Sequence, residues 1–425
     1  MIRKFLPKSG FARNVLTLFT GSTIAQLIPV AISPLLTRIF PVTDFATLTV
    51  FSTLVSFLGV IVCGRYEIAI GLPSEDKDAK QILYLALMVT LIVSSIAMVL
   101  ALIFNNFIAE LLNNQAAAPY ILLVPLAALF YGLNQALTYW NIRKRQYALM
   151  SGSRIGQSLT NSGTSLASGY SGAAYNGLVI GQLSGFAAAF FYTYFRTLFS
   201  GGDTFSRKEA NKSEMKRLAL KYIDQPRVNG VHAFTDMLQV TGVVFIISAV
   251  FGSITTGLYG LAIRILQAPL NMIGSSFSIV FYKEASEKVA TGQKITKLLK
   301  TTILTLALIS FPVFLIIMIF GPSLFAFVFG EVWREAGVYA RILSPWLFVG
   351  FISSPVSHLP VILNQQRQFF LLSLIGNSLM IISILCGAFI FDDIKMGLLL
   401  ISVSQVIFLS CLLVYFYKIS KKAHG

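Results

Sequence analysis

Residues 301–320 read TTILTLALISFPVFLIIMIF, a stretch of sequence without a charged side chain. A helix of about 20 apolar residues crosses about 30 Å of hydrocarbon, so this stretch predicts a membrane-spanning helix. Apolar runs of similar length recur along the whole chain, and the one at 155–173 is the weakest because Ser and Gly dominate it. The predicted spans are 14–37, 45–72, 81–104, 119–140, 155–173, 176–195, 228–250, 255–281, 301–320, 338–363, 369–391 and 396–417.

The composition also indicates a membrane protein. The chain of 425 residues is 56% hydrophobic and 12% charged, and its mean hydropathy is +0.76. A soluble protein of this length could not keep so much apolar surface away from water. The first run is too long for a signal peptide and no small-residue cleavage site follows it, so we expect it to be a retained helix.

The distribution of Lys and Arg predicts the orientation in the membrane. The net charge is +16, which in a soluble protein would suggest nucleic acid as a partner. Here almost all of the 33 Lys and Arg fall in alternate loops, which is the positive-inside pattern. We therefore expect both termini in the cytoplasm and no nucleic-acid partner. The exceptions are Arg38, Arg334, Arg341 and Lys395 in the opposite loops, and Arg65 and Arg264 inside predicted spans.

A polar stretch divides the chain into halves of six spans each. We predict an N-terminal six-helix lobe over 1–200, a cytoplasmic linker over 201–227 and a C-terminal six-helix lobe over 228–425. Within the linker, Ser213–Tyr222 has the pattern of an amphipathic helix lying on the inner membrane surface. Equal halves joined in this way are typical of duplicated parallel repeats.

The sequence contains none of the usual catalytic signatures. We find no phosphate-binding Gly loop, no nucleophile elbow and no His, Asp or Glu cluster with metal-ligand spacing. Cys63, Cys386 and Cys411 lie far apart inside apolar runs, where they most simply serve as small apolar fillers. No loop is large enough to fold as a catalytic domain. We therefore predict a protein that moves a solute, not an enzyme, without a cofactor or a metal.

Charged and titratable residues inside the second-half spans form the first set of candidate functional residues. Charges in a bilayer are costly, so each needs a partner or a hydrated cavity. Arg264 lies near the middle of its run, and its guanidinium fits phosphate or carboxylate. It either recognises an anionic substrate group or forms an ion pair with Asp236. His232 and Asp236 share one helix face and could take up a proton; a satisfied polar network, or a counter-ion role for Asp236, is the alternative.

The first-half spans carry a second set of polar candidates. Arg65 either lines the inner mouth of a cavity or extends to lipid headgroups. Glu67, two residues further along, should point to a different helix face. Gln26 on the first run and Asn134 and Gln135 on the fourth are neutral groups that suit a hydroxyl-rich ligand, although helix packing is the more common use of such residues.

Several motifs stand out along the chain, namely Ile32–Phe40, the Gly-Arg-Tyr-Glu pattern of 64–67, Gly257–Arg264, Pro269 and Ile273-Gly274. With these motifs the chain resembles the polysaccharide-biosynthesis (O-antigen) flippases of the multidrug/oligosaccharidyl-lipid/polysaccharide exporter superfamily, abbreviated MOP. The resemblance implies twelve transmembrane helices in two six-helix lobes, with a MATE-like V shape and a central cationic cavity.

The resemblance also implies a function. Such proteins move undecaprenyl-pyrophosphate-linked oligosaccharide from the inner to the outer leaflet of the bacterial cytoplasmic membrane by alternating access. Arg264 matches the family's eighth-helix arginine and would bind the diphosphate, while Arg65 matches its second-helix motif. The expected partners are the lipid-linked glycan, membrane lipids, a proton or sodium ion for coupling, and polysaccharide-assembly proteins.

Three other functions fit parts of the sequence. A cation-coupled multidrug exporter of the same superfamily would show acidic residues in its cavity, whereas here Arg65 and Arg264 balance Glu67 and Asp236. A peptidoglycan-precursor flippase would be expected to have fourteen helices and more cavity arginines. A membrane-embedded glycan polymerase or ligase would carry a large outside loop, which this chain lacks.

Overall fold

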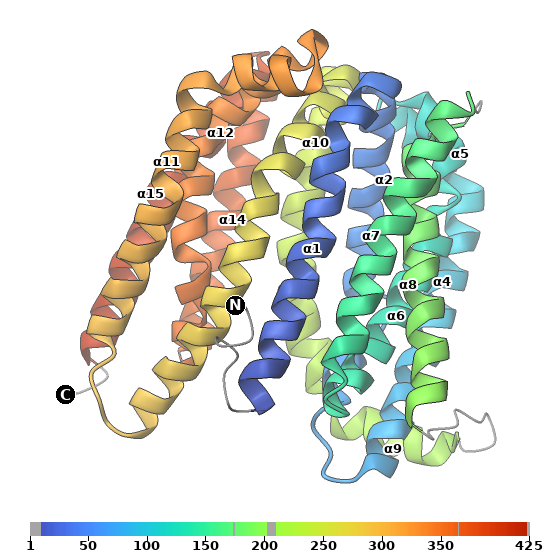
Figure 1. Cartoon of the computed structure of the whole chain (residues 1–425), viewed down its shortest axis with the longest axis vertical. Helices are drawn as coiled ribbons and strands as arrows, with labels where there is room; N and C mark the ends of the chain where they lie inside the picture. The colour runs from blue at the N-terminus through green and yellow to red at the C-terminus, as the bar shows by residue number, and fades with distance from the viewer. Residues whose placement is uncertain (1–9, 173–174, 202–209, 364, 423–425) are drawn as a thin grey trace, which may run out of the picture. The chain divides into compact units, whose positions relative to one another are not determined.

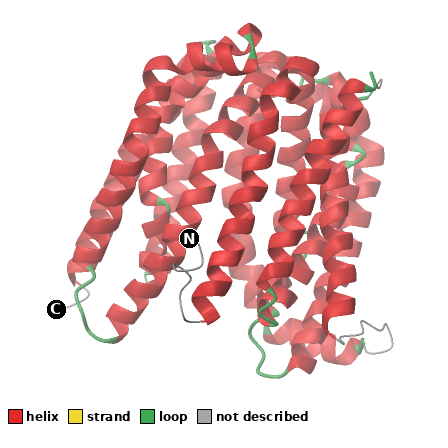
Figure 2. Cartoon of the chain, viewed as in Figure 1, coloured by secondary structure: helices red, strands yellow, loops and turns green. Residues whose placement is uncertain are grey.

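The computed structural model describes residues 10–172, 175–201, 210–363 and 365–422. Within those ranges every regular element is a helix, and short loops join the helices (Figure 2). Nine described helices are long and apolar enough to cross a membrane, and a bent pair, Gln115–Ile121 with Val124–Arg143, makes a tenth. This count takes α10 once and leaves out the polar α7. With α7 and the second half of α10 included, each of the twelve predicted runs contains a described helix.

The chain separates into two compact units, Met1–Thr241 and Gly242–Gly425. The boundary falls inside α10 and therefore after the predicted linker at 201–227, of which 202–209 lie outside the described residues. The first unit contains α1 (Gly10–Ile39), α2 (Val42–Ile61), α3 (Tyr66–Ala69), α4 (Asp76–Leu111), α5 (Ala118–Ile121), α6 (Val124–Arg143), α7 (Tyr147–Tyr170), α8 (Gly177–Gly201), α9 (Lys212–Lys221), a π-helical turn at Gln225–Gly230 and the start of α10.

The second unit contains the rest of α10 and the four long helices that follow it (Figure 1). Its elements are α10 (Val231–Ala290), α11 (Thr296–Phe329), α12 (Arg334–Ser353), α13 (Leu359–Ile362), α14 (Gln366–Phe389) and α15 (Ile394–Lys422). Helix α10 joins the predicted spans 228–250 and 255–281, with a break at Gly252, where φ is 80°. Glycine adopts this left-handed backbone without a steric penalty, so the chain changes direction here in a single residue.

Helix α7 is polar yet spans the bundle because small residues let α8 approach it closely. Gly181 and Gly185 of α8 lie one turn apart and face α7. A Cβ atom at Gly181 would lie 2.7 Å from the Asn161 carbonyl oxygen, and one at Gly185 would lie 2.9 Å from that of Gln157. Such close packing of small residues stabilises helix pairs in membranes, where apolar burial alone provides little driving force.

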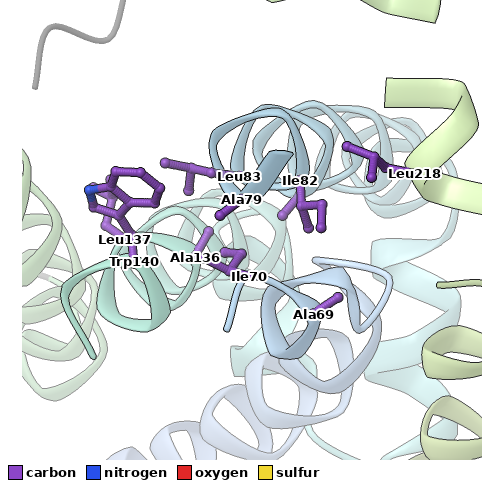
Figure 3. Close-up of a cluster of buried hydrophobic side chains, with 10 residues drawn as sticks. Ala69, Ile70, Ala79, Ile82, Leu83, Ala136, Leu137, Trp140 and Leu218 are labelled. Carbon is purple, nitrogen blue, oxygen red and sulfur yellow. The ribbon is translucent and has the colours of Figure 1, made fainter. Parts of the chain in front are cut away.

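The linker helix α9 forms where an amphipathic helix was predicted, but its apolar face packs on protein. Met215 and Leu218 are 5% and 0% exposed, and Leu218 belongs to a buried cluster with residues of α3, α4 and α6 (Figure 3). Arg217 forms ion pairs with Glu214 and Asp78, and hydrogen bonds to these carboxylates raise the pKa of Arg217 above its ordinary value. Helix α9 is therefore part of the first unit.

Candidate functional site

The Gly-Arg-Tyr-Glu motif forms a break between α2 and α3. The backbones of Gly64 and Arg65 are both left-handed, with φ values of 59° and 61°. This conformation is uncommon for a residue with a side chain and persists only where surrounding contacts enforce it. Helix α2 therefore ends at Ile61, and the chain does not continue as one helix to residue 72 as predicted.

The break brings Arg65, Glu67 and Gln135 together. Nη1 of Arg65 lies 3.6 Å from Oε1 of Glu67, whose side chain is 1% exposed. Nε2 of Gln135 in α6 donates to the same Oε1 at 3.3 Å. The prediction that Glu67 points away from Arg65 is therefore wrong, because it assumed a continuous helix in which residues two apart face different directions.

Each member of this cluster keeps one buried polar atom without a hydrogen-bond partner among the described residues. These atoms are Nε of Arg65, Oε2 of Glu67 and Oε1 of Gln135. Buried polar groups are normally satisfied, so such atoms mark a place where water or a ligand group supplies the missing bond. One donor and two acceptors suit a hydroxyl group, which can both donate and accept.

Asn134 and Gln26 lie in other polar contacts of the first unit. Oδ1 of Asn134 accepts from Thr193 Oγ1 of α8 at 2.8 Å, and Thr193 Oγ1 also lies 2.9 Å from Ser153 Oγ of α7. Asn134 thus takes part in helix packing. Gln26 on α1 has a buried Oε1 atom without a partner among the described residues.

A further cation within a span was missed in the sequence. Arg154 directly precedes the predicted span 155–173, but α7 begins at Tyr147, so Arg154 lies inside the helix. Its Nη1 donates to Ser22 Oγ of α1. Ser22 lies one helical turn before Gln26, so α1 presents both groups on one side. The feature of the sequence that could have placed Arg154 inside a helix is the Ser-rich helical pattern that follows it.

The predicted pair His232–Asp236 is present. Nδ1 of His232 lies 3.2 Å from Oδ2 of Asp236, and the two side chains are 37% and 48% exposed. Both residues belong to the first unit, whereas Arg264 belongs to the second. The alternative in which Asp236 pairs with Arg264 stays a prediction.

Arg264 lies in the second limb of α10, twelve residues after the break at Gly252, or about 18 Å along the helix at 1.5 Å per residue. It is half-buried, and its neighbours Leu261, Ala262 and Leu266 are 0 to 1% exposed. Among the described carboxylates of the second unit, Glu287, Glu331 and Glu335 pair with other residues, and none pairs with Arg264.

The profile of a family described as polysaccharide biosynthesis protein matches residues 35–338, which is more than half of the chain. The chain belongs to this family. The resemblance seen in the sequence motifs is thereby confirmed. No curated protein matches the sequence of this family member.

Solved structures of a flippase and of transporters share the fold of this chain. The lipid II flippase MurJ, in an inward closed conformation, matches with a TM-score of 0.76 and 13% identity, over 96% of this chain and 90% of that one. An inward-facing multidrug resistance MATE family transporter of the MOP superfamily matches with a TM-score of 0.65 and 12% identity, over 96% of this chain and 95% of that one. A MOP superfamily transporter from Pyrococcus furiosus matches with a TM-score of 0.64 and 12% identity, over 97% of this chain and 96% of that one.

These findings establish the class of the protein. It is an all-helical, multi-pass membrane protein with the fold of MATE transporters and MurJ, and it belongs to a polysaccharide-biosynthesis family. The matched structures are transporters and a flippase, not enzymes.

Proposed function

We propose that this protein moves a diphosphate-linked lipid oligosaccharide from the inner to the outer leaflet of the bacterial cytoplasmic membrane by alternating access, with both termini in the cytoplasm. The family match supports a role in polysaccharide assembly. The fold shared with a lipid II flippase supports transport of a lipid-linked headgroup.

The proposal rests on the position of Arg264 inside a membrane-spanning helix. A guanidinium held inside a membrane-spanning segment is costly unless an anion or water compensates its charge. Arg264 has no carboxylate partner among the described residues of its own unit. Arginine stays charged and presents its N–H groups in a fork that binds two phosphate oxygens at once. A diphosphate group supplies the missing anion.

The first unit contains its own hydrogen-bonding groups that fit sugar hydroxyls. Arg65, Glu67 and Gln135 carry buried atoms that need hydrogen-bond partners, and so does Gln26. A sugar hydroxyl donates and accepts, so it can satisfy both kinds of atom. Asn134 contributes indirectly, because its bond to Thr193 holds α6 against α8 beside Gln135.

The pair His232–Asp236 is our candidate for coupling to an ion gradient. The His232 ring lies within hydrogen-bond distance of the Asp236 carboxylate, an arrangement suited to proton transfer. Proton uptake at this pair would change the charge of a helix that continues through Gly252 toward Arg264.

The cellular test uses a bacterium whose own flippase gene is deleted and whose surface polysaccharide is scored. The wild-type chain should restore the polymer. Arg264→Ala should reach the membrane at normal levels but leave the polymer absent. Normal polymer with Arg264→Ala would refute the role of Arg264. Restored resistance to cationic dyes without any polymer would indicate a multidrug exporter instead.

A further inference from the structure

Two lysines of the second unit converge on one tyrosine ring. Lys300 of α11 lies 5.1 Å from the ring centre of Tyr417 in α15, and Lys421 lies 4.7 Å from the same centre. Both lysines are exposed. A cation near an aromatic ring gains a modest attraction, but two ammonium groups at one ring also repel each other. The arrangement is therefore favourable where an anion binds between them.

Buried contacts hold the two helix ends in place. Thr296 Oγ1 donates to the carbonyl oxygen of Ser420 at 3.1 Å, and Ser420 Oγ donates to Thr296 Oγ1 at 3.3 Å. Leu299, which precedes Lys300, is 0% exposed and packs in one cluster with Phe416 and Ile419 of α15. The backbone at both lysines is thus fixed before any ligand arrives, which lowers the entropy cost of binding.

No described carboxylate neutralises these lysines. Among the described ion pairs, the lysine ammonium groups that meet a carboxylate are those of Lys144, Lys283 and Lys395. The described partners of Lys300 and Lys421 are the ring and the hydroxyl group of Tyr417. The cluster of Lys300, Lys421 and Tyr417 therefore presents two positive charges and a phenol hydroxyl to an incoming anion.

The surface beside the cluster indicates which anion fits. An exposed apolar stripe continues from Lys300 along the same face of α11, through Leu304, Leu308 and Phe311, which are 61%, 75% and 54% exposed. Residues at spacings of three and four lie on one helix face. A soluble phosphate has no apolar group to contact this stripe, whereas the acyl chains of a phospholipid would cover it.

We propose that the cluster of Lys300, Lys421 and Tyr417 binds the phosphate of an anionic phospholipid whose acyl chains lie along Leu304, Leu308 and Phe311. The lysines neutralise the phosphate and the tyrosine donates to it. The site lies where the end of α15 meets the membrane surface, and it is independent of the transported substrate. A bound lipid would join the ends of α11 and α15.

The experiment measures lipid retention by the full-length protein in neutral detergent, using native mass spectrometry with phosphatidylglycerol or phosphatidylcholine. The test variant is Lys300→Gln/Lys421→Gln. The control, Lys212→Gln/Lys216→Gln on α9, removes the same charge from two other exposed lysines. Each lysine near an anionic lipid contributes about 1 kcal/mol, so we expect about thirtyfold weaker phosphatidylglycerol binding in the test variant, at 1.4 kcal/mol per factor of ten.

The control should bind phosphatidylglycerol within about twofold of wild type, since its lysines lie outside the cluster. Phosphatidylcholine should bind weakly to every variant. The proposal is overturned if the test variant retains phosphatidylglycerol like wild type, or if both double variants lose it equally. Displacement of phosphatidylglycerol by millimolar inorganic phosphate would also overturn it, because the site would then accept a soluble anion.

Discussion

The guanidinium of Arg65 lies 3.6 Å from the carboxylate of Glu67, which is 1% exposed, and Gln135 donates to the same carboxylate oxygen. The left-handed backbone of Gly64 and Arg65 breaks the helix and brings the two side chains within contact distance. Removing one partner of a buried ion pair leaves the other charge uncompensated, which costs more than the pair itself contributes.

We predict that Arg65→Ala destabilises the protein by about 2 kcal/mol, less than for a fully buried pair because Arg65 retains some exposure. The double variant Arg65→Ala/Glu67→Gln should recover part of this loss, since its carboxylate charge is gone. Thermal unfolding in detergent measures both. A double variant less stable than Arg65→Ala would show that the charge of Glu67 is not the source of the loss.

Two leucines of α9 test whether the linker helix is held by the protein. Leu218 is 0% exposed and Leu220 is 63% exposed. Leu218→Ala should cost about 2–5 kcal/mol, as for other buried leucines, whereas Leu220→Ala should change stability by less than about 0.5 kcal/mol. The readout is thermal unfolding with protease sensitivity at the linker. Equal effects of the two substitutions would mean that α9 does not pack on the first unit.

Helices α11 and α12 approach closely at Gly337. A Cβ atom there would lie 2.6 Å from Pro322 Cα and would also meet the Gly321 carbonyl oxygen, whereas one at Gly350 of α12 meets only Leu409 at 3.9 Å. Gly337→Ala should lower stability by about 1–3 kcal/mol through overpacking. Gly350→Ala should be neutral or stabilising by up to about 1 kcal/mol. Unchanged thermal unfolding of Gly337→Ala would refute this close approach.

The proposed coupling pair predicts a dependence on the pH gradient. In vesicles, an imposed gradient should change the flipping rate of the wild-type protein and leave that of Asp236→Asn unchanged, because the variant cannot exchange a proton with His232. Asp392→Asn, at an exposed turn after α14, is the matched control and should respond like wild type. A wild-type rate that ignores the gradient removes the coupling role.

Most of the fold could be predicted from the sequence because the apolar runs dominate it. The hydropathy of the run 301–320 is sufficient to predict its helix. The break at Gly252 falls between the two predicted spans 228–250 and 255–281. Helix α7 was the weakest prediction, and its packing depends on Gly181 and Gly185 in a different run.

The candidate site was harder to predict, because its contacts depend on backbone geometry. A helical pattern places Arg65 and Glu67 on different faces. The motif alone does not predict that Gly64 and Arg65 both adopt a left-handed backbone. Arg154 falls just outside the predicted span 155–173, and its bond to Ser22 depends on the packing of α1 on α7. The amphipathic pattern of Ser213–Tyr222 predicts an apolar face on the membrane surface, whereas Leu218 of this face is buried against protein. Such a pattern does not distinguish a membrane from a protein surface.

The most direct measurement is transport of a fluorescent undecaprenyl-diphosphate oligosaccharide across vesicles that contain the purified protein. A hydrogen bond to a charged group contributes about 1.5–3 kcal/mol, so Arg264→Gln should slow flipping by about tenfold to a hundredfold. Arg367→Gln, an exposed arginine at the start of α14, should flip at the wild-type rate. Equal rates for wild type and Arg264→Gln would contradict the account.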